Sequence, residues 1–207
     1  MDPNFLITAF FALFVVIDPI GLAPLFVALT VGMSPAKRRS IAIRASLVAI
    51  GILLVFSLFG EGILEFIGIS MPAFRIAGGI LLFITALDML FERRQKRRED
   101  QAEEDEQHED DPSVFPLAIP LIAGPGSIAT IILLVGQTEG TAGYFAVMGV
   151  LLAVFAMTFV MFLGASTIER LLGKTGITVV TRLLGMLLAA LSVQFVLDGL
   201  ASFGLGG

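Results

Sequence analysis

The chain has 207 residues, of which 57% are hydrophobic, and its mean hydropathy is +0.96. This apolar content exceeds what a soluble domain of this length buries, so the composition favours an integral membrane protein. The chain has no Cys, which excludes disulfides, thiolate metal sites and thiol nucleophiles. The net charge of −5 does not indicate a cationic partner, because nine of the 18 acids lie in one run within residues 99–111.

Hydropathy predicts membrane spans along the chain. A window of about 20 apolar residues, enough to cross a bilayer, selects six spans, at 5–31, 41–60, 71–91, 114–135, 142–163 and 178–203. We therefore predict an all-α integral membrane fold with six transmembrane helices.

A charged linker divides these helices into two groups. Its boundaries, 92–112, separate a first three-helix repeat (1–91) from a second (113–207) within one membrane domain. Its composition is typical of a hydrated, solvent-facing segment. The single histidine of the chain, His108, lies in this linker and is expected to be hydrated.

The placement of Lys and Arg predicts the orientation in the membrane. Cytoplasmic loops retain cations close to the helix ends. The second and fourth loops have none, whereas the first, third and fifth hold all 11 loop cations. We predict that both termini lie outside and that linker 92–112 is cytoplasmic. The loop cations are Lys37, Arg38, Arg39, Arg44, Arg93, Arg94, Lys96, Arg97, Arg98, Arg170 and Lys174.

An internal repeat relates the two halves of the chain. The pattern Gly-Ile-(Ser/Thr) followed by Arg-x-x-Gly begins at Gly68 and again at Gly176, and its arginines, Arg75 and Arg182, are 107 residues apart. Each copy contains three spans, an odd number, so the second copy must be inserted upside down. The sequence therefore predicts inverted repeats, as in many secondary transporters.

Both repeats begin with a span that Pro and Gly interrupt. Asp18 before Pro19 has the form of an N-cap followed by proline at the first helical position, and the fourth span contains Gly124-Pro125-Gly126-Ser127. We predict that helices 1 and 4 are broken. Ser127 is available to cap the second half of helix 4.

The two breaks predict a binding site near the midplane. The N–H groups where the half-helices restart attract a carboxylate, and the unpaired carbonyls where the first halves end can take an ammonium or a small cation. Asp18 serves as a helix cap, as a proton carrier, or as both; Arg75 and Arg182 either face the cavity or extend to the membrane interface. The predicted substrate-binding residues are Asp18, Pro19, Gly21, Leu22, Gly124, Gly126, Ser127, Arg75 and Arg182.

The interrupted spans resemble the paired signatures of the MarC family, also called the six-span neutral amino acid transporter family. The resemblance rests on Asp18 to Phe26 and on Ile119 to Ser127, and it extends over the full chain. It implies a multi-pass protein of a bacterial or archaeal cell (inner) membrane, with transport of small neutral amino acids such as glycine or alanine in some members. The family pattern accepts Asp or Asn at the position of Asp18 and usually has Asn at that of Leu22.

We predict a secondary transporter that binds a small zwitterion between helices 1 and 4 in the lipid bilayer, with H⁺ or Na⁺ as the coupling ion. An ion or metal-cation exporter or channel is one alternative, and a non-transporting membrane scaffold is another. No enzyme activity is predicted, because the spans contain no His, Cys or paired carboxylates. No metal site, cofactor or nucleic-acid partner is predicted either, and the sequence leaves oligomer formation open.

Overall fold

The computed structural model describes residues 3–94, 96–98 and 111–204, and this part of the chain folds into helices without a strand. One element, η1, is irregular, because Phe115 and Ile119 within it have extended backbone angles. The elements are α1 (Pro3–Ile17), α2 (Pro19–Leu29), α3 (Pro35–Phe66), α4 (Met71–Leu90), the π-helix η1 (Ser113–Ile122), α6 (Pro125–Val135), α7 (Gly140–Leu163) and α8 (Ala165–Ala201).

The described helices include five segments that are long and apolar enough to cross a membrane, or six if the bent pair of η1 and α6 counts as one span. This confirms the prediction of an all-helical protein with several membrane spans. α1 and α2 together form the first span, Pro3–Leu29. α3, with 32 residues, and α8, with 37 residues, are longer than predicted. Each has charged residues near its start that an apolar window leaves out.

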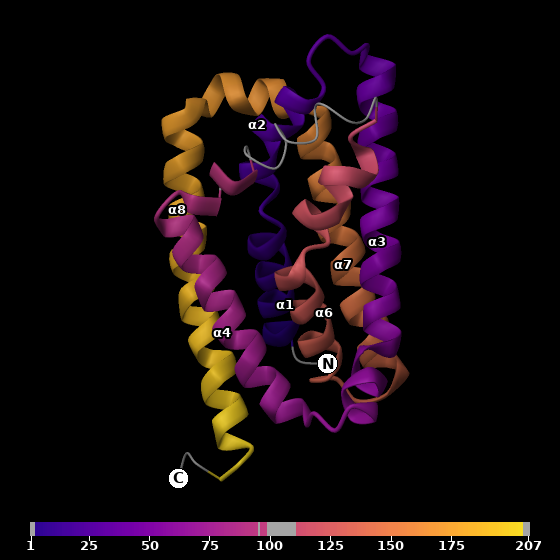
Figure 1. The fold of residues 1–207 in the computed structure, drawn as a ribbon, viewed down its shortest axis with the longest axis vertical. Helices are drawn as coiled ribbons and strands as arrows, with labels where there is room; N and C mark the ends of the chain where they lie inside the picture. The colour runs from indigo at the N-terminus through magenta and orange to yellow at the C-terminus, as the bar shows by residue number, and fades with distance from the viewer. Residues whose placement is uncertain (1–2, 95, 99–110, 205–207) are drawn as a thin grey trace.

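α8 has two parts. At Gly173 the backbone has φ 60° and ψ 175°, which interrupts the helix, and glycine adopts such positive φ values without a steric penalty. The turns before Gly173 lie across one end of the bundle, and the longer part runs to the C-terminus at the other end (Figure 1). The predicted sixth span, 178–203, corresponds to this longer part.

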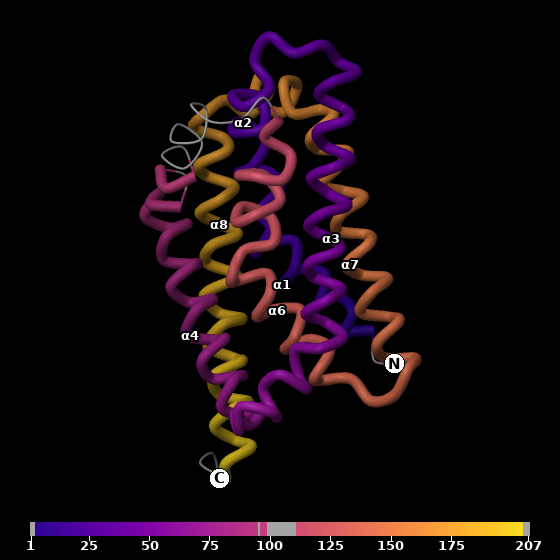
Figure 2. The backbone as a smooth tube through the Cα atoms, turned by 45° about the vertical axis from the view of Figure 1, so that its right-hand side comes forward, coloured from indigo at the N-terminus to yellow at the C-terminus, as the bar shows by residue number. Residues whose placement is uncertain are grey.

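The first turn of α1 and the last turn of α8 lie at the same end of the bundle, and the last turn of α4 and the first turn of η1 lie toward the opposite end (Figures 1 and 2). α4 packs along α8, α3 contacts η1 and α6, and α7 contacts α1 and α2. The apolar window of the α1–α2 span is 56% buried, against 28% for those of α4 and α8. The interrupted first span is therefore central, while α4 and α8 have large faces available to lipid.

Small residues allow α4 and α8 to approach closely. A Cβ atom added at Gly79 would lie 2.8 Å from the backbone oxygen of Ser192, and one added at Gly185 would lie 3.2 Å from that of Ala86. This spacing leaves no room for a side chain at either glycine, as is common in membrane helix pairs. The pair holds in place the end of α4, from which the chain continues toward the site.

Candidate functional site

The first span is interrupted at Asp18. α1 ends at Ile17, α2 begins at Pro19, and Asp18 between them has the left-handed conformation, with φ 56° and ψ 62°. Asp tolerates this conformation better than most residues, because its short side chain can bond the local backbone. Its carboxylate accepts a hydrogen bond from Gly21 N–H at 3.1 Å and so caps α2. Asp18 is 1% exposed, so the protein buries a charge at this point.

The charge of Asp18 is neutralised by Arg98, from the segment that follows α4. Arg98 Nη1 lies 2.9 Å from Asp18 Oδ2, and Arg98 Nη2 donates to the carbonyl oxygen of Ile17 at 3.3 Å. The Arg98 side chain is 6% exposed. Desolvation lowers the pKa of the Arg98 guanidinium, and the charge and hydrogen bond of Asp18 oppose that effect. The attraction between the two charges therefore offsets part of the free-energy cost of burying each of them.

Two further arginines of the same segment bind nearby acceptors. Arg94 donates to the carbonyl oxygen of Val16, and Arg97 pairs with Asp88 on α4 with 2.7 Å between Nη2 and Oδ2. We call residues 93–98 the arginine segment; its described members are Arg93, Arg94, Lys96, Arg97 and Arg98. The final carbonyls of α1, predicted to take a substrate ammonium, thus accept hydrogen bonds from guanidinium groups.

The fourth span is interrupted between Ile122 and Pro125, and η1 and α6 meet there at an angle of 57°. Ser127 does not cap α6, as the sequence had suggested, because its hydroxyl donates to the carbonyl oxygen of Ile122 at 2.6 Å. No side chain caps the N-terminus of α6. The N–H groups of its first turn have no acceptor within the helix, so this end retains the positive end of the helix dipole.

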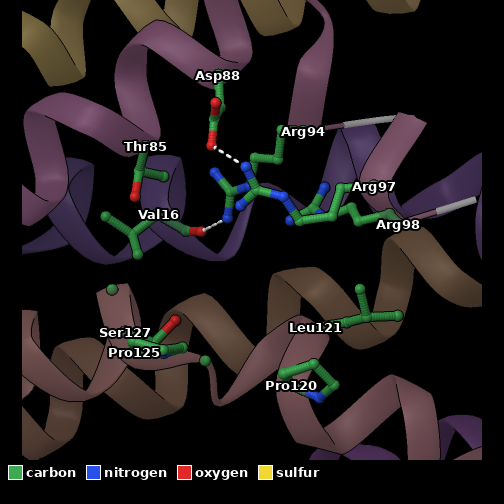
Figure 3. A pocket seen from close by; sticks show the side chains of 12 residues that line it. Val16, Thr85, Asp88, Arg94, Arg97, Arg98, Pro120, Leu121, Pro125 and Ser127 are labelled. Atoms are coloured by element: carbon green, nitrogen blue, oxygen red, sulfur yellow. Dashed lines mark hydrogen bonds and ion pairs between the residues drawn. The ribbon is translucent and has the colours of Figure 1, made fainter. Parts of the chain in front are cut away.

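A cavity of about 290 Å³ lies against this uncapped N-terminus. Arg94, Arg97 and Arg98 reach toward it from one side, and Pro125 and Ser127 lie on the opposite side (Figure 3). Arg97 is paired with Asp88 and Arg98 with Asp18, whereas Arg94 binds a carbonyl oxygen, so the wall has one positive charge in excess, which favours an anionic group. The lining residues are Val16, Thr85, Asp88, Arg94, Arg97, Arg98, Pro120, Leu121, Gly124, Pro125, Gly126 and Ser127.

A much smaller cavity, of about 10 Å³, lies on the Asp18 side of Arg98. This volume corresponds to about one water molecule. Thr181, on α8, borders it and is 8% exposed, and its Oγ1 has no hydrogen-bond partner among the described residues. The lining residues are Asp18, Gly21, Asp88, Met89, Glu92, Arg94, Arg98, Thr178 and Thr181.

The predicted site residues separate into four groups. Gly124, Gly126 and Ser127 line the larger cavity, while Asp18 and Gly21 line the smaller one. Pro19 and Leu22 are buried in the first turn of α2 beside Asp18. Arg75 and Arg182 line neither cavity: the first lies near the start of α4, and the second forms an ion pair with Glu92.

The cations of the site are therefore those of the arginine segment, which sequence reasoning placed in a hydrated linker. That interpretation was wrong for Arg98, which is buried against Asp18. The remaining calls on the linker, including His108, fall on residues 99–110, outside the described part of the chain. The one feature of the sequence that could have indicated these site residues is the high density of cations directly after the third predicted span. A hydropathy profile gives such a run the same value whether it is hydrated or folded back onto a buried acid.

Comparisons with known proteins match nearly the whole chain. A family model described as "MarC family integral membrane protein" matches residues 3–203. The UPF0056 membrane protein YvbG of Bacillus subtilis is 40% identical over 95% of this chain and 94% of its own length. A UPF0056 membrane protein of Methanocaldococcus jannaschii is 36% identical over 97% and 98%. The UPF0056 inner membrane protein YhgN of Escherichia coli is 36% identical over 95% and 96%. No solved structure matches.

Proposed function

Because the chain belongs to the MarC family of integral membrane proteins, we propose that it is a secondary transporter of small neutral amino acids such as glycine or alanine. The substrate binds as a zwitterion between the two interrupted spans. The observation that carries this proposal is one cavity that has an uncapped helix N-terminus on one wall and lies next to a buried carboxylate. A site with both features is suited to a molecule that has one negative and one positive group.

The carboxylate of the substrate binds at the first turn of α6. Pro125 has no N–H group, so the donors are the N–H groups of Gly126 and Ser127, which have no acceptor within the helix. Anions bind readily at such helix ends. Gly126 leaves this end accessible, because a Cβ atom there would lie 3.2 Å from Val16 Cγ1 and 3.8 Å from Thr85 Oγ1.

The ammonium of the substrate binds at Asp18 and at the last carbonyls of α1. The same acceptors bind guanidinium groups in this structure, since Arg98 donates to Asp18 and Ile17 and Arg94 donates to Val16. Their use by two cationic side chains supports the assignment of a cation subsite. H⁺ carried by Asp18, or Na⁺ at the same oxygens, is the proposed coupling ion.

The proposed site fits an inverted-repeat architecture. In this arrangement α1, α2, α3 and α4 correspond to η1, α6, α7 and α8. Exchanging the halves maps the contact of α3 with η1 onto that of α7 with α1, and the contact of α4 with α6 onto that of α8 with α2. α4 and α8 also run in opposite directions (Figure 1). Inverted repeats place a site near the midplane, where the halves meet.

We propose an orientation with both termini outside and the arginine segment on the cytoplasmic side of a bacterial or archaeal cell membrane. Loop cations favour the cytoplasmic side. Lys174→Cys and Glu139→Cys, each in an exposed position, provide the test, because the chain has no native Cys. We expect an impermeant maleimide to label Glu139→Cys in intact cells and Lys174→Cys only in inside-out vesicles. The reverse pattern would show the opposite orientation.

Two alternatives remain testable beside transport of amino acids. An ion or metal-cation exporter would need several converging acids, and the described residues contain no cluster of three or more His, Cys, Asp or Glu side chains suited to a metal ion. A non-transporting scaffold would need no polar cavity at the breaks. We propose no enzyme activity, cofactor or nucleic-acid partner, and oligomer formation is left open.

Counterflow in proteoliposomes tests the proposal. Liposomes that hold the purified protein and unlabelled glycine are diluted into labelled glycine, and the transient accumulation of label is compared with that in protein-free liposomes. We expect saturable accumulation with glycine and alanine, altered by either a pH gradient or a Na⁺ gradient. Cation flux without glycine counterflow would favour the exporter, and the absence of both fluxes from folded protein would favour the scaffold.

A further inference from the structure

We propose that the arginine segment is an internal ligand that closes the transport site, with Arg98 in the place of the substrate ammonium. Substrate then binds only when the segment withdraws. This inference rests on the proposed function, because it assigns a regulatory role at the same site. The observation that carries it is the buried ion pair between Arg98 and Asp18, two residues 80 positions apart in the chain.

The geometry makes Arg98 and a substrate ammonium mutually exclusive. One oxygen of Asp18, Oδ1, accepts from Gly21 N–H, and the other, Oδ2, accepts from Arg98. The Ile17 carbonyl accepts from Arg98 as well. With both carboxylate oxygens used and the residue 1% exposed, an ammonium reaches Oδ2 only if Arg98 leaves.

Polar contacts hold the described part of the segment against the site. All its described members are Arg or Lys. Arg94, Arg97 and Arg98 form ion pairs and hydrogen bonds with Asp18, Asp88 and main-chain carbonyls, and Arg94 also contacts the sulfur of Met89. The guanidinium of Arg93 lies 5.8 Å from the centre of the Phe91 ring. Arg97 remains 61% exposed although it is paired. A segment held in this way can be displaced by another cation that binds the same acceptors, which an apolar anchor would prevent.

The position of the segment also determines what it blocks. It borders the larger cavity, and Arg94 and Arg98 border the smaller cavity as well. Asp18, Gly21 and Thr181 line only the smaller cavity. Withdrawal of Arg98 would therefore join the cation subsite at Asp18 to the larger cavity, in which the substrate carboxylate binds at the N-terminus of α6.

A cysteine reporter behind Arg98 tests closure without relying on transport. Thr181→Cys is suitable, because Thr181 is 8% exposed and its hydroxyl has no partner among the described residues. An impermeant maleimide is applied from the side at which Lys174→Cys is labelled. We expect Arg98→Gln to raise the labelling rate of Thr181→Cys at least about tenfold, because closure reduces the accessible fraction of the protein. Arg93→Gln, in the same segment but without a contact to Asp18 in this structure, is the matched control and should leave the rate unchanged.

Glycine counterflow in the same variants separates the two proposals. Arg98→Gln should lower the KM for glycine at least about tenfold, since an internal competitor is removed. Arg98→Lys keeps the positive charge that supports folding, but an ammonium lacks the planar pair of nitrogens with which Arg98 binds Asp18 and Ile17 together. Its labelling rate and its KM should therefore lie between those of wild type and Arg98→Gln. This variant replaces Arg98→Gln in the test if Arg98→Gln does not fold. Unchanged labelling of Thr181→Cys in folded Arg98 variants, whether or not glycine flux is lost, would overturn the proposed closure. Increased labelling with no glycine flux in any variant would support closure and contradict the proposed substrate.

Discussion

Asp18→Ala should lower the free energy of unfolding by about 3–5 kcal/mol, because it leaves the buried Arg98 guanidinium without its partner. The substitution also removes the N-cap of α2, which is worth about 1 kcal/mol. Alanine has no side chain that supports the left-handed backbone at this position. The loss of folded protein is measured by heating the detergent-solubilised variant and following the monodisperse peak by size exclusion.

Asp18→Asn separates the structural part of this effect from the charge. Asn caps helices about as well as Asp and tolerates the left-handed conformation, so this variant should be clearly more stable than Asp18→Ala. Asp198→Ala is the control, because Asp198 is only partly buried on α8 and its carboxylate accepts a hydrogen bond from the exposed Gln194. Adding Arg98→Ala to Asp18→Ala should recover part of the lost stability. Equal stability of wild type and Asp18→Ala would contradict the buried ion pair.

Gly126→Val should reduce glycine counterflow at least about tenfold. A Cβ atom at this position already lies 3.2 Å from Val16 Cγ1 and 3.7 Å from Leu82 Cδ2, and the two γ-methyl groups would enter the space beside the first turn of α6. These groups would keep the substrate carboxylate from the N–H groups of Gly126 and Ser127. A hydrogen bond to a charged group contributes about 1.5–3 kcal/mol, and about 1.4 kcal/mol corresponds to a tenfold change in binding. Initial rates of counterflow, at equal amounts of reconstituted protein, provide the measurement.

Gly149→Val is the matched control for this substitution. Gly149 lies within α7, and a Cβ atom there meets no other atom within 4 Å. The control therefore adds the same groups to a membrane helix without filling the site, and its flux should remain near that of wild type. Equal flux in both variants would place the substrate away from the N-terminus of α6.

Much of the fold was predictable because membrane spans depend on a local property. The bilayer requires long apolar segments whose backbone bonds are satisfied within the helix, and a hydropathy window detects such segments directly. The same window missed the starts of α3 and α8, which contain charged residues. Ser34 caps α3 before Lys37, and the part of α8 before Gly173 lies across the end of the bundle, so these turns are helical without being apolar.

The site was predictable only where it depends on local backbone chemistry. Asp18-Pro19 and Gly124-Pro125 indicate interruptions from neighbouring residues alone, and the structure places both beside the cavities. The partner of Asp18 could not be predicted in this way. Arg98 is 80 positions away and belongs to a run of five cations, any of which could have been hydrated. Arg75 and Arg182 were selected by repeat symmetry, but the arginines that line the cavities belong to the linker between the two repeats, to which that symmetry does not apply.

Competition for labelled glycine tests whether one site binds both charged groups of a small amino acid. Binding to the purified protein is measured with increasing unlabelled glycine, acetate or methylammonium. A hydrogen bond to a charged group contributes about 1.5–3 kcal/mol, so a competitor with only one of the two groups should need a concentration more than about tenfold higher than glycine. We expect unlabelled glycine to displace the labelled glycine, and acetate and methylammonium to displace it poorly. Equal displacement by acetate, or the absence of saturable glycine binding to the folded protein, would contradict binding of both charged groups at this site.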